Sequence, residues 1–351
     1  MRFKIKPGCR KTPLQSGSPQ TNRLEVSMKY ATTLRRALAA TSLLVASIAL
    51  GQNYPSKPVR LIVPLAAGGS TDIIGRTMAQ KLTETWGQSV LVDNRTGGAT
   101  IIGTDSVAKA APDGHTLLVT PAPFSVNVTL LAGKLPYDTA RDFAPIVLIN
   151  TSPLVLVVHP EVPAKTVREL VALAKAQQGK MNYGSSTVGG SGHLSAELLN
   201  MMGEVKSQHI PYKGNAPALA DLMAGRVTFV FNGTTSVLTL IQAGRLRALG
   251  VTSLTRVSAL PDVPTMDEAG LKGFSATAWN GLSAPGKTPA AIIAKINVDA
   301  NKAIASAEVL QRLKNDGSEP GGGSPQQFDA FIKEETAKWA RVIKAGNIQA
   351  E

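Results

Sequence analysis

Short β-branched runs alternate with helical patterns along most of this chain of 351 residues. The run 59–64 leads through small residues into a helical pattern over 72–86, and the run 90–93 leads through two glycines into another over 101–110. Such alternation predicts an α/β fold with parallel sheets, in which loops at the carboxyl ends of the strands bind ligands. Further strands are expected at 116–120, 144–149, 154–159, 182–184, 207–211, 227–231, 246–251 and about 278–282, and further helices at 166–178, 193–202, 216–224, 236–243, 290–306 and 326–344.

Positive charge is concentrated at the amino end of the chain. Residues 1–51 contain nine of the 37 Lys and Arg residues and only one of the 24 Asp and Glu residues. The formal net charge is +13 for the whole chain and therefore +5 for residues 52–351. A charge this small excludes a binding surface for the phosphates of nucleic acid and suits a small anionic ligand.

Residues 28–51 have the composition of an export signal. Three basic residues precede the apolar run 37–50, and small residues lead to a polar start, which is the pattern of a secretory signal peptide. The run is shorter than the ~20 residues that a membrane-spanning helix needs. We expect an upstream extension over 1–27, cleavage after Ala49 or Gly51 and a mature chain in the periplasm; a retained anchor or basic arm is the alternative.

Residue counts exclude several kinds of chemistry. Cys9 is the one cysteine and lies in the segment expected to be removed, so the mature chain would have no disulfide, thiolate metal site or cysteine nucleophile. The four histidines lack metal-ligand spacing, and no glycine motif for a dinucleotide or nucleoside triphosphate occurs. We therefore expect neither a metal nor a cofactor.

Two glycine–serine loops carry the functional inference. Residues 66–72 (Ala-Ala-Gly-Gly-Ser-Thr-Asp) and 188–193 (Val-Gly-Gly-Ser-Gly-His) each follow a predicted strand and open a helix. Glycines allow close approach, and the free N–H groups at a helix start attract an anion. Facing each other, the loops would hold two anionic groups of one ligand, as in a dicarboxylate; two ordinary helix caps are the alternative. Asp72, which Arg76 can neutralise, either positions the helix or binds a ligand hydroxyl or ammonium group.

Two further loops leave strand ends and are candidates for the same site. One follows the strand expected at 207–211 and offers Tyr212 and Lys213 as donors, with a packed tyrosine and a solvated lysine as the alternative. The other is rich in proline and offers groups at Ala122 and Ser125, with a stiff turn as the alternative.

Motifs for catalysis are weak in this chain. A nucleophile elbow needs glycine where His193 stands, and Ser191 lies too close to His193 in sequence for a triad without a placed acid. We therefore expect a receptor that is not an enzyme. The competing hypothesis is an exported α/β hydrolase-like enzyme that acts on carboxylates through this pair, and a third is a sensor subunit that presents its liganded form to a signalling protein.

Motifs spread over residues 54–351 occur together in one family. They are Lys57–Arg60, Val63–Pro64, Gly68–Gly69, Asp72, Arg76, Val92–Arg95, Gly97–Ala99, Leu135–Asp138, Asp142–Phe143, Tyr183–Ser186, Gly192–Leu194, Pro211–Gly214, Leu260–Thr265 and Trp279–Leu282. With them the chain resembles the periplasmic substrate-binding proteins of tripartite tricarboxylate transporters, often called Bug proteins. The resemblance implies a type II periplasmic-binding fold whose two domains close on a small carboxylate and deliver it to the permease subunits. We expect a monomer with no nucleic acid partner.

The resemblance also implies particular site residues and domain boundaries. The ligand-binding residues would be Ala66, Ala67, Gly68, Gly69, Ser70 and Asp72 in the first domain and Ser185, Ser186, Gly189, Ser191 and His193 in the second. This sequence differs from the family pattern at Leu65, where many members carry an aromatic residue before the first loop. The first domain would comprise 52–152 and 253–351, the second 153–252, with hinges at 150–153 and 252–256. Di- and tricarboxylates, acidic amino acids and aromatic acids all suit a site built from backbone donors.

Overall fold

The computed structural model describes residues 54–212 and 214–350 of the chain. The expected extension 1–27, the expected signal peptide 28–51 and the candidate ligand residue Lys213 lie outside the described residues.

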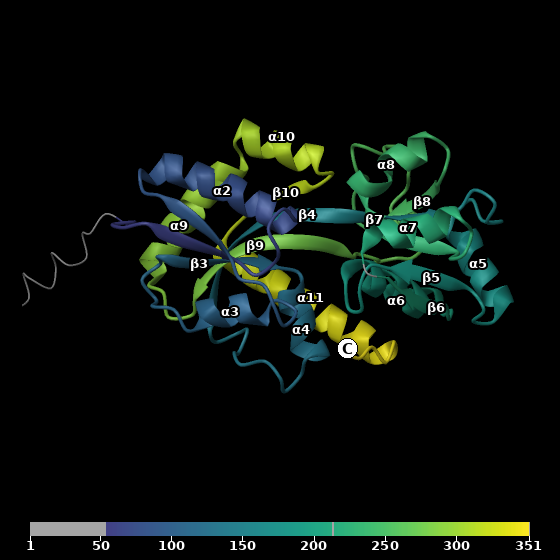
Figure 1. Cartoon of the computed structure of the whole chain (residues 1–351), viewed down its shortest axis with the longest axis horizontal. Helices are drawn as coiled ribbons and strands as arrows, with labels where there is room; N and C mark the ends of the chain where they lie inside the picture. The colour runs from purple at the N-terminus through teal and green to yellow at the C-terminus, as the bar shows by residue number, and fades with distance from the viewer. Residues whose placement is uncertain (1–53, 213, 351) are drawn as a thin grey trace, which may run out of the picture. The chain divides into compact units, whose positions relative to one another are not determined.

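The chain divides after Ser56 into two units, and the second unit holds a mixed sheet with helices on both faces (Figure 1). No helix described in it is long and apolar enough to cross a membrane. The strands follow one another in the order β2 (Val90–Asn94), β1 (Val59–Val63), β3 (Thr116–Pro121), β9 (Thr277–Pro285), β4 (Phe143–Val158), β7 (Phe229–Gly233), β5 (Asn182–Ser185) and β6 (Gln208–Pro211), and β8 (Arg247–Val251) and β10 (Glu319–Gly322) both pair with β4.

The strands at the two ends of this order run parallel, whereas the central ones run antiparallel. β1 pairs in parallel with β2 and β3, and β5 with β6 and β7. β4 and β9 run antiparallel to each other and to their other neighbours. The parallel strands are followed by helices in sequence, as βαβ crossovers require, and the predicted α/β class is confirmed.

β4 is the long strand that joins the two halves of the sheet. Its first part pairs with β9 and β10, and its last part, Leu154–Val158, pairs with β7 and β8. The prediction of two separate strands at 144–149 and 154–159 is therefore wrong. The polar residues between them continue the strand, because Asn150 Nδ2 donates to Ser152 Oγ at 3.1 Å and the residue before Pro153 favours an extended backbone.

Helices cover both faces of each half of the sheet. In the half around β1, the helices are α2 (Ser70–Trp86), α3 (Ile101–Ala108), α4 (Pro123–Leu130), α9 (Ala290–Ile304) and α10 (Ala307–Asn315). In the half around β5, they are α5 (Val167–Gln177), α6 (Ser191–Gly203), α7 (Asn215–Met223) and α8 (Thr234–Gln242). The helix α11 (Pro325–Ala345) packs against α4 and α6, and so it contacts both halves.

The structure contains three elements that the sequence did not predict. A stiff turn is one of the two interpretations of the proline-rich loop, but in α4 Pro123 occupies the first turn of a helix, where its missing N–H costs nothing. α10 begins at Ala307, directly after the end of the helix predicted at 290–306, and β10 is a short glycine-rich strand at the sheet edge. The other elements lie close to their expected positions.

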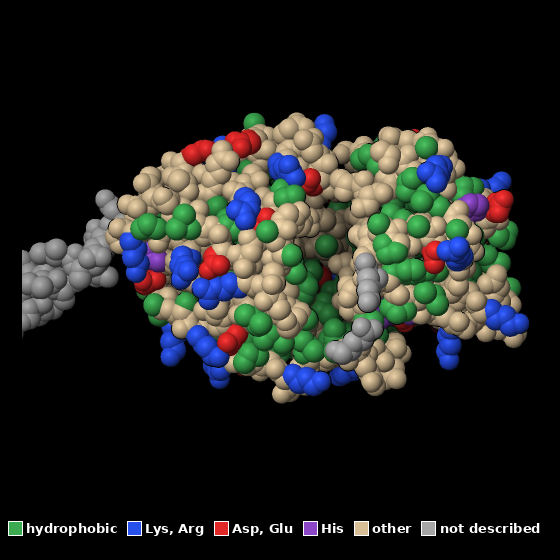
Figure 2. All heavy atoms as spheres, in the orientation of Figure 1, with side chains coloured by type: hydrophobic (Ala, Val, Ile, Leu, Met, Phe, Trp, Pro, Cys, Tyr) green, Lys and Arg blue, Asp and Glu red, His purple; other side chains and the backbone are tan. Residues whose placement is uncertain are grey.

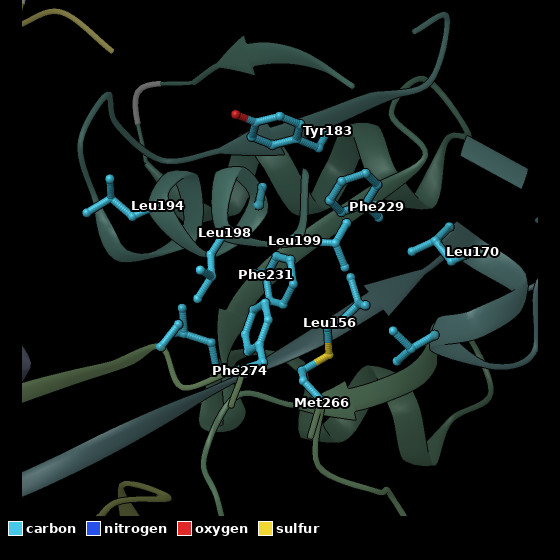
Figure 3. Packing of buried hydrophobic residues seen from close by; sticks show 14 of the residues in the cluster. Leu156, Leu170, Tyr183, Leu194, Leu198, Leu199, Phe229, Phe231, Met266 and Phe274 are labelled. Atoms are coloured by element: carbon cyan, nitrogen blue, oxygen red, sulfur yellow. The ribbon is translucent and has the colours of Figure 1, made fainter. Parts of the chain in front are cut away.

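The larger hydrophobic core lies under α5 and α6. Leu156 of β4, Phe229 and Phe231 of β7 and Tyr183 of β5 pack against leucines of α6 (Figure 3). Met266 and Phe274, which follow β8, complete this core. The last turns of α11 also bury Trp339, Val342 and Ile343 there, although its first turns bury Phe328 and Ile332 in the core around β1. The domain boundaries expected from the sequence stay predictions, because residues 57–351 form one unit.

Candidate functional site

A cleft of about 470 Å³ lies where the two halves of the sheet meet. Figure 2 shows it as a hollow in the middle of the face, between the half that carries α2 and the half that carries α8. Its floor is formed by β4 and β9, through residues such as Asn150 and Asn280. Its size lies within the range of about 300–1,000 Å³ that is usual for small-molecule sites.

Five helices begin at this cleft, and none of their N-terminal amides is capped by a side chain. In an α-helix the first N–H groups have no acceptor within the helix, and the helix dipole makes this end positive. The free amides at these starts can therefore donate hydrogen bonds to an anion. α4 contributes fewer of them than the other helices, because Pro123 has no N–H and the Ser125 amide donates to the Ala122 carbonyl at 3.1 Å. The N-cap residues are Gly69 for α2, Ala122 for α4, Gly190 for α6, Gly214 for α7 and Gly233 for α8.

The described residues that line the cleft include a single ionisable side chain, Asp316. Its carboxylate is paired with Arg312, whose Nε lies 3.0 Å from Asp316 Oδ2. An anion bound here would consequently be held by neutral donors and helix dipoles rather than by a lysine or arginine of the described lining.

A chain of hydrogen-bonded polar side chains crosses the cleft floor. Thr71 Oγ1 donates to Asn280 Oδ1 at 2.8 Å, and Asn280 Nδ2 donates to Asn150 Oδ1 at 3.1 Å. Asn150 in turn donates to Ser152, whose hydroxyl lies 2.7 Å from that of Ser318. These residues come from α2, β9, β4 and the segment before β10, and all five line the cleft. Because they partner one another, they can be buried there without loss of hydrogen bonding.

Two tryptophans give the cleft an apolar wall. Trp279 and Trp339 are both buried and both line it. Glu335 accepts from both indoles, at 3.3 Å from Trp279 Nε1 and 2.8 Å from Trp339 Nε1, and it also pairs with Lys338. The indole N–H groups are thus satisfied within the protein, and the rings remain to contact the apolar part of a ligand.

Asp72 organises the loop that precedes α2. Its Oδ2 accepts from the Gly68 amide at 2.8 Å and from Arg76 Nε at 3.0 Å, and its Oδ1 accepts from Asn94 at 2.9 Å. Burial by itself would raise the pKa of this carboxyl, but the hydrogen bonds from Arg76, Gly68 and Asn94 hold the pKa below its usual value. These contacts are those of a residue that positions the helix, one of its two predicted roles.

His193 plays a comparable part in the loop that precedes α6. Its Nδ1 accepts from the Gly189 amide at 2.9 Å, and its ring stacks on His209 with centroids 3.9 Å apart. Burial and the neighbouring His209 lower the pKa of His193 to about 3. The imidazole is neutral at pH 7 and a poor base for a serine hydroxyl.

The cleft gathers some of the residues that sequence analysis proposed as ligand-binding and leaves others outside its lining. The residues in the lining are Ser70, Ala122, Ser186, Gly189 and Ser191. Those outside the lining are Ala66, Ala67, Gly68, Gly69, Asp72, Ser125, Ser185, His193 and Tyr212, and Lys213 is outside the described residues. Contact with a ligand stays a prediction for all of them.

Several residues outside the lining hold neighbouring elements in place. Ser185 Oγ lies 2.7 Å from His209 Nε2, and Tyr212 donates to Asp221 at 2.8 Å. The buried Ser125 donates to the Ile332 carbonyl at 3.5 Å. Leu65, the departure from the family pattern, lies in the cleft lining and extends its apolar surface.

Sequence analysis missed the β7–α8 loop, residues 232–236, which lines the cleft. Asn232-Gly233-Thr234-Thr235 joins a strand to a helix in the same way as the two glycine–serine loops. That shared strand–glycine–hydroxyl–helix order was the available signal. The floor residues Asn150 and Asn280 carried no local signal, since they lie 130 positions apart and meet only across paired strands.

The chain is similar to known proteins. The profile of the tripartite tricarboxylate transporter family receptor matches residues 74–348. BugT of Bordetella pertussis is 35% identical over 318 residues, which cover 89% of this chain and 97% of BugT.

Two solved structures from Rhodopseudomonas palustris are also similar. Rpa4515 with adipate is 35% identical, with a TM-score of 0.71 over 84% of this chain and 99% of that one. MatC with bound malate is 31% identical, with a TM-score of 0.67 over 83% of this chain and 100% of that one. The predicted two-domain periplasmic-binding fold is thereby confirmed. This chain belongs to the tripartite tricarboxylate transporter receptor family.

Proposed function

We propose that this protein is a periplasmic receptor that binds a small carboxylate in the cleft and delivers it to a permease of the tripartite tricarboxylate type. The observation that carries the proposal is the set of five uncapped helix starts around a cleft whose described lining has no lysine, arginine or histidine. Such amides satisfy a carboxylate by hydrogen bonding and by the helix dipole. Adipate in Rpa4515 and malate in MatC support this ligand class.

The proposal extends to export and to the residues that contact the ligand. Residues 28–51 direct the chain to the periplasm and are then removed. Ser70 and Ala122 contact the ligand from one side of the cleft, and Ser186, Gly189 and Ser191 contact it from the other. Asp72 and His193 support these contacts by holding the two loops.

Hydrolysis by Ser191 and His193 is not supported. The Nδ1 of His193 already accepts from Gly189, and the lowered pKa of its ring makes it a weak general base at neutral pH. The receptor hypothesis needs no such base. A receptor returns its ligand chemically unchanged, which proton NMR of the incubated ligand would establish.

Binding is tested by thermal denaturation and calorimetry with the purified protein, after partial unfolding and dialysis to remove any bound ligand. Adipate and malate are compared with citrate and with the monoacid hexanoate. At 100 times its dissociation constant a ligand stabilises the folded state by about 2.7 kcal/mol, which a melting curve detects. We expect stabilisation by at least one di- or tricarboxylate, and no stabilisation by any carboxylate would overturn the proposal.

A further inference from the structure

One buried side chain in the cleft keeps an unsatisfied donor. Asn232, at the end of β7, is 2% exposed, and its Nδ2 has no hydrogen-bond partner. Other described side-chain atoms share this condition, such as Thr104 Oγ1 and Thr288 Oγ1, but their residues do not line the cleft. A buried donor without a partner destabilises the protein unless something else accepts from it.

The orientation of the Asn232 amide is fixed by its neighbour. The Gly233 N–H donates to Asn232 Oδ1 at 2.8 Å. If the amide were reversed, two N–H donors would face each other, so this contact assigns the oxygen to Gly233 and leaves Nδ2 as the free donor.

The position of Asn232 in the sheet is one that normally carries an apolar side chain. It lies two residues after Val230 and is opposite Val155 of β4 in the register. Both valines belong to the core under α7 and α8, which also contains Val237 of α8. An asparagine at the end of this apolar face gives up hydrophobic burial, which indicates a role other than packing.

The free donor lies beside a helix start that is also open. α8 begins at Thr234, and its N-cap Gly233 provides no side-chain acceptor. The residues Gly233, Thr234, Thr235 and Ser236 all line the cleft together with Asn232. The first amides of α8 and the Asn232 Nδ2 group therefore form one set of neutral donors at one wall of the cleft.

We propose that Asn232 and the first turn of α8 together bind one carboxylate group of the ligand, with Asn232 Nδ2 as its side-chain donor. The inference rests on the proposed function and deepens it, because it assigns one carboxylate group of the ligand to a half-site that sequence analysis missed. The helix start supplies the favourable potential for the negative charge. The amide of Asn232, held by Gly233, supplies a directed hydrogen bond that fixes where the carboxylate oxygen lies.

The test compares Asn232→Asp and Asn232→Leu with the unaltered protein, with adipate as the first probe in calorimetry and malate as the second. Asn232→Asp keeps the acceptor for Gly233 but replaces the donor by a negative charge, so we expect at least a hundredfold loss of affinity. Asn232→Leu removes the donor without adding charge. A hydrogen bond to a charged group corresponds to about a ten- to hundredfold change in affinity, and we expect a loss of that size.

A matched control separates binding from folding. Asn127 is equally buried, but its Nδ2 donates to the Ala99 carbonyl at 2.7 Å and it is not in the cleft lining. We expect Asn127→Asp to lower the melting temperature and to leave adipate affinity unchanged. Asn232→Leu should keep the melting temperature of the ligand-free protein, because it buries no new charge on this apolar face and no protein acceptor loses its donor. This variant therefore separates loss of binding from loss of folding.

A spectroscopic measurement adds a readout that a structural role would not change. In a ¹⁵N-labelled sample, the side-chain amide signals of Asn232 are identified as those lost in Asn232→Asp, and they should shift when adipate or malate binds. The half-site would be overturned if both Asn232 variants bound the ligand as tightly as the unaltered protein. It would also be overturned if the Asn232 side-chain amide signals did not shift at ligand saturation. In either case the proposed function would still stand. If the unaltered protein bound none of the carboxylates tested, the proposed function would fail, and the half-site with it. If it bound citrate but neither adipate nor malate, citrate becomes the probe for the same variants.

Discussion

The helices that begin at the cleft differ from those that begin elsewhere in the described part of the chain. α2, α4, α6, α7 and α8 begin at the cleft, and four of their five N-cap residues are glycine. α3, α5, α9, α10 and α11 begin away from it, and none of their N-cap residues is glycine. Two helices of the second group have side-chain caps, from Thr166 in α5 and from Ser324 in the capping box of α11.

The difference between the two groups is the glycine at the N-cap, because α3, α9 and α10 also lack a side-chain cap. A Ser or Thr cap fills the acceptor position at the helix start and stabilises the helix by about 0.5–2 kcal/mol relative to alanine. Glycine is tolerated there at a cost of a few tenths of a kcal/mol and leaves the amides free. A binding protein can therefore accept slightly weaker helix starts at its cleft, because the ligand completes them.

The largest expected effect comes from giving α8 an acidic cap. A Cβ at Gly233 would meet nothing within 4 Å, and its φ of −58° suits any residue. In Gly233→Asp the new carboxylate would accept from the first amides of α8 and repel a bound carboxylate, which together weaken binding by about 3 kcal/mol or more. Calorimetry with adipate or malate measures the loss.

Ser306→Asp is the control, because it adds the same charge at the N-cap of α10, outside the cleft lining. We expect its affinity for the same ligand to be unchanged. Equal affinities in both variants would show that the start of α8 does not face the ligand, and the comparison of the two helix groups would lose its functional meaning.

The next effect concerns Asp72, which holds the uncapped start of α2. We expect Asp72→Asn to lower the free energy of unfolding at pH 7 by about 1–3 kcal/mol, since the carboxylate accepts from Arg76 and from the Gly68 amide. Chemical denaturation at pH 7 checks this value.

The same variant carries a pH signature. The folded-state pKa of Asp72 lies below its ordinary value, so its stabilising contribution is complete above the unfolded pKa of about 3.9 and is lost as the pH falls through the folded pKa. The difference in stability between the two proteins should therefore narrow below about pH 4. A constant difference down to pH 2.5 would contradict the assigned role.

A smaller effect is expected at a helix of the other group. Ser324→Ala removes the capping box of α11, in which Gln327 N–H donates to Ser324 Oγ at 3.2 Å. Such a loss destabilises by about 1 kcal/mol, which urea denaturation resolves. Ligand affinity should stay the same, and a parallel loss of affinity would erase the distinction between the two groups.

The smallest effect is expected from a neutral cap on α2. At Gly69 a Cβ would lie 3.5 Å from the Ala66 carbonyl oxygen, an ordinary contact. Gly69→Ser should raise the free energy of unfolding by a few tenths of a kcal/mol and lower affinity severalfold, since the serine hydroxyl competes with the ligand for the same amides. Stronger binding in this variant would contradict the proposed use of the α2 start.

Sequence analysis located the glycine–serine loops before α2 and α6 because both patterns are local. It missed Asn232, since an asparagine after an apolar strand is also a common turn residue, and only burial without a partner distinguishes it. It named Asp72 and His193 as candidate ligand residues, with helix positioning as the second role for Asp72, and that ligand contact stays a prediction; the structure adds that both side chains accept from amides of their own loops. Loop-internal hydrogen bonds of this kind are not encoded by residue type.

The sequence by itself determined the α/β alternation and most helix starts, because periodicity, capping preference and glycine positions act over a few neighbouring residues. The family followed from the resemblance of motifs spread over the chain to those of known proteins. Only the tertiary structure decided which helix starts share a cleft and that Thr71, Asn150, Asn280 and Ser318 join into one polar floor. The physical reason is that β4 and β9 meet through pairing across more than a hundred residues, and such long-range pairing has no counterpart in local sequence.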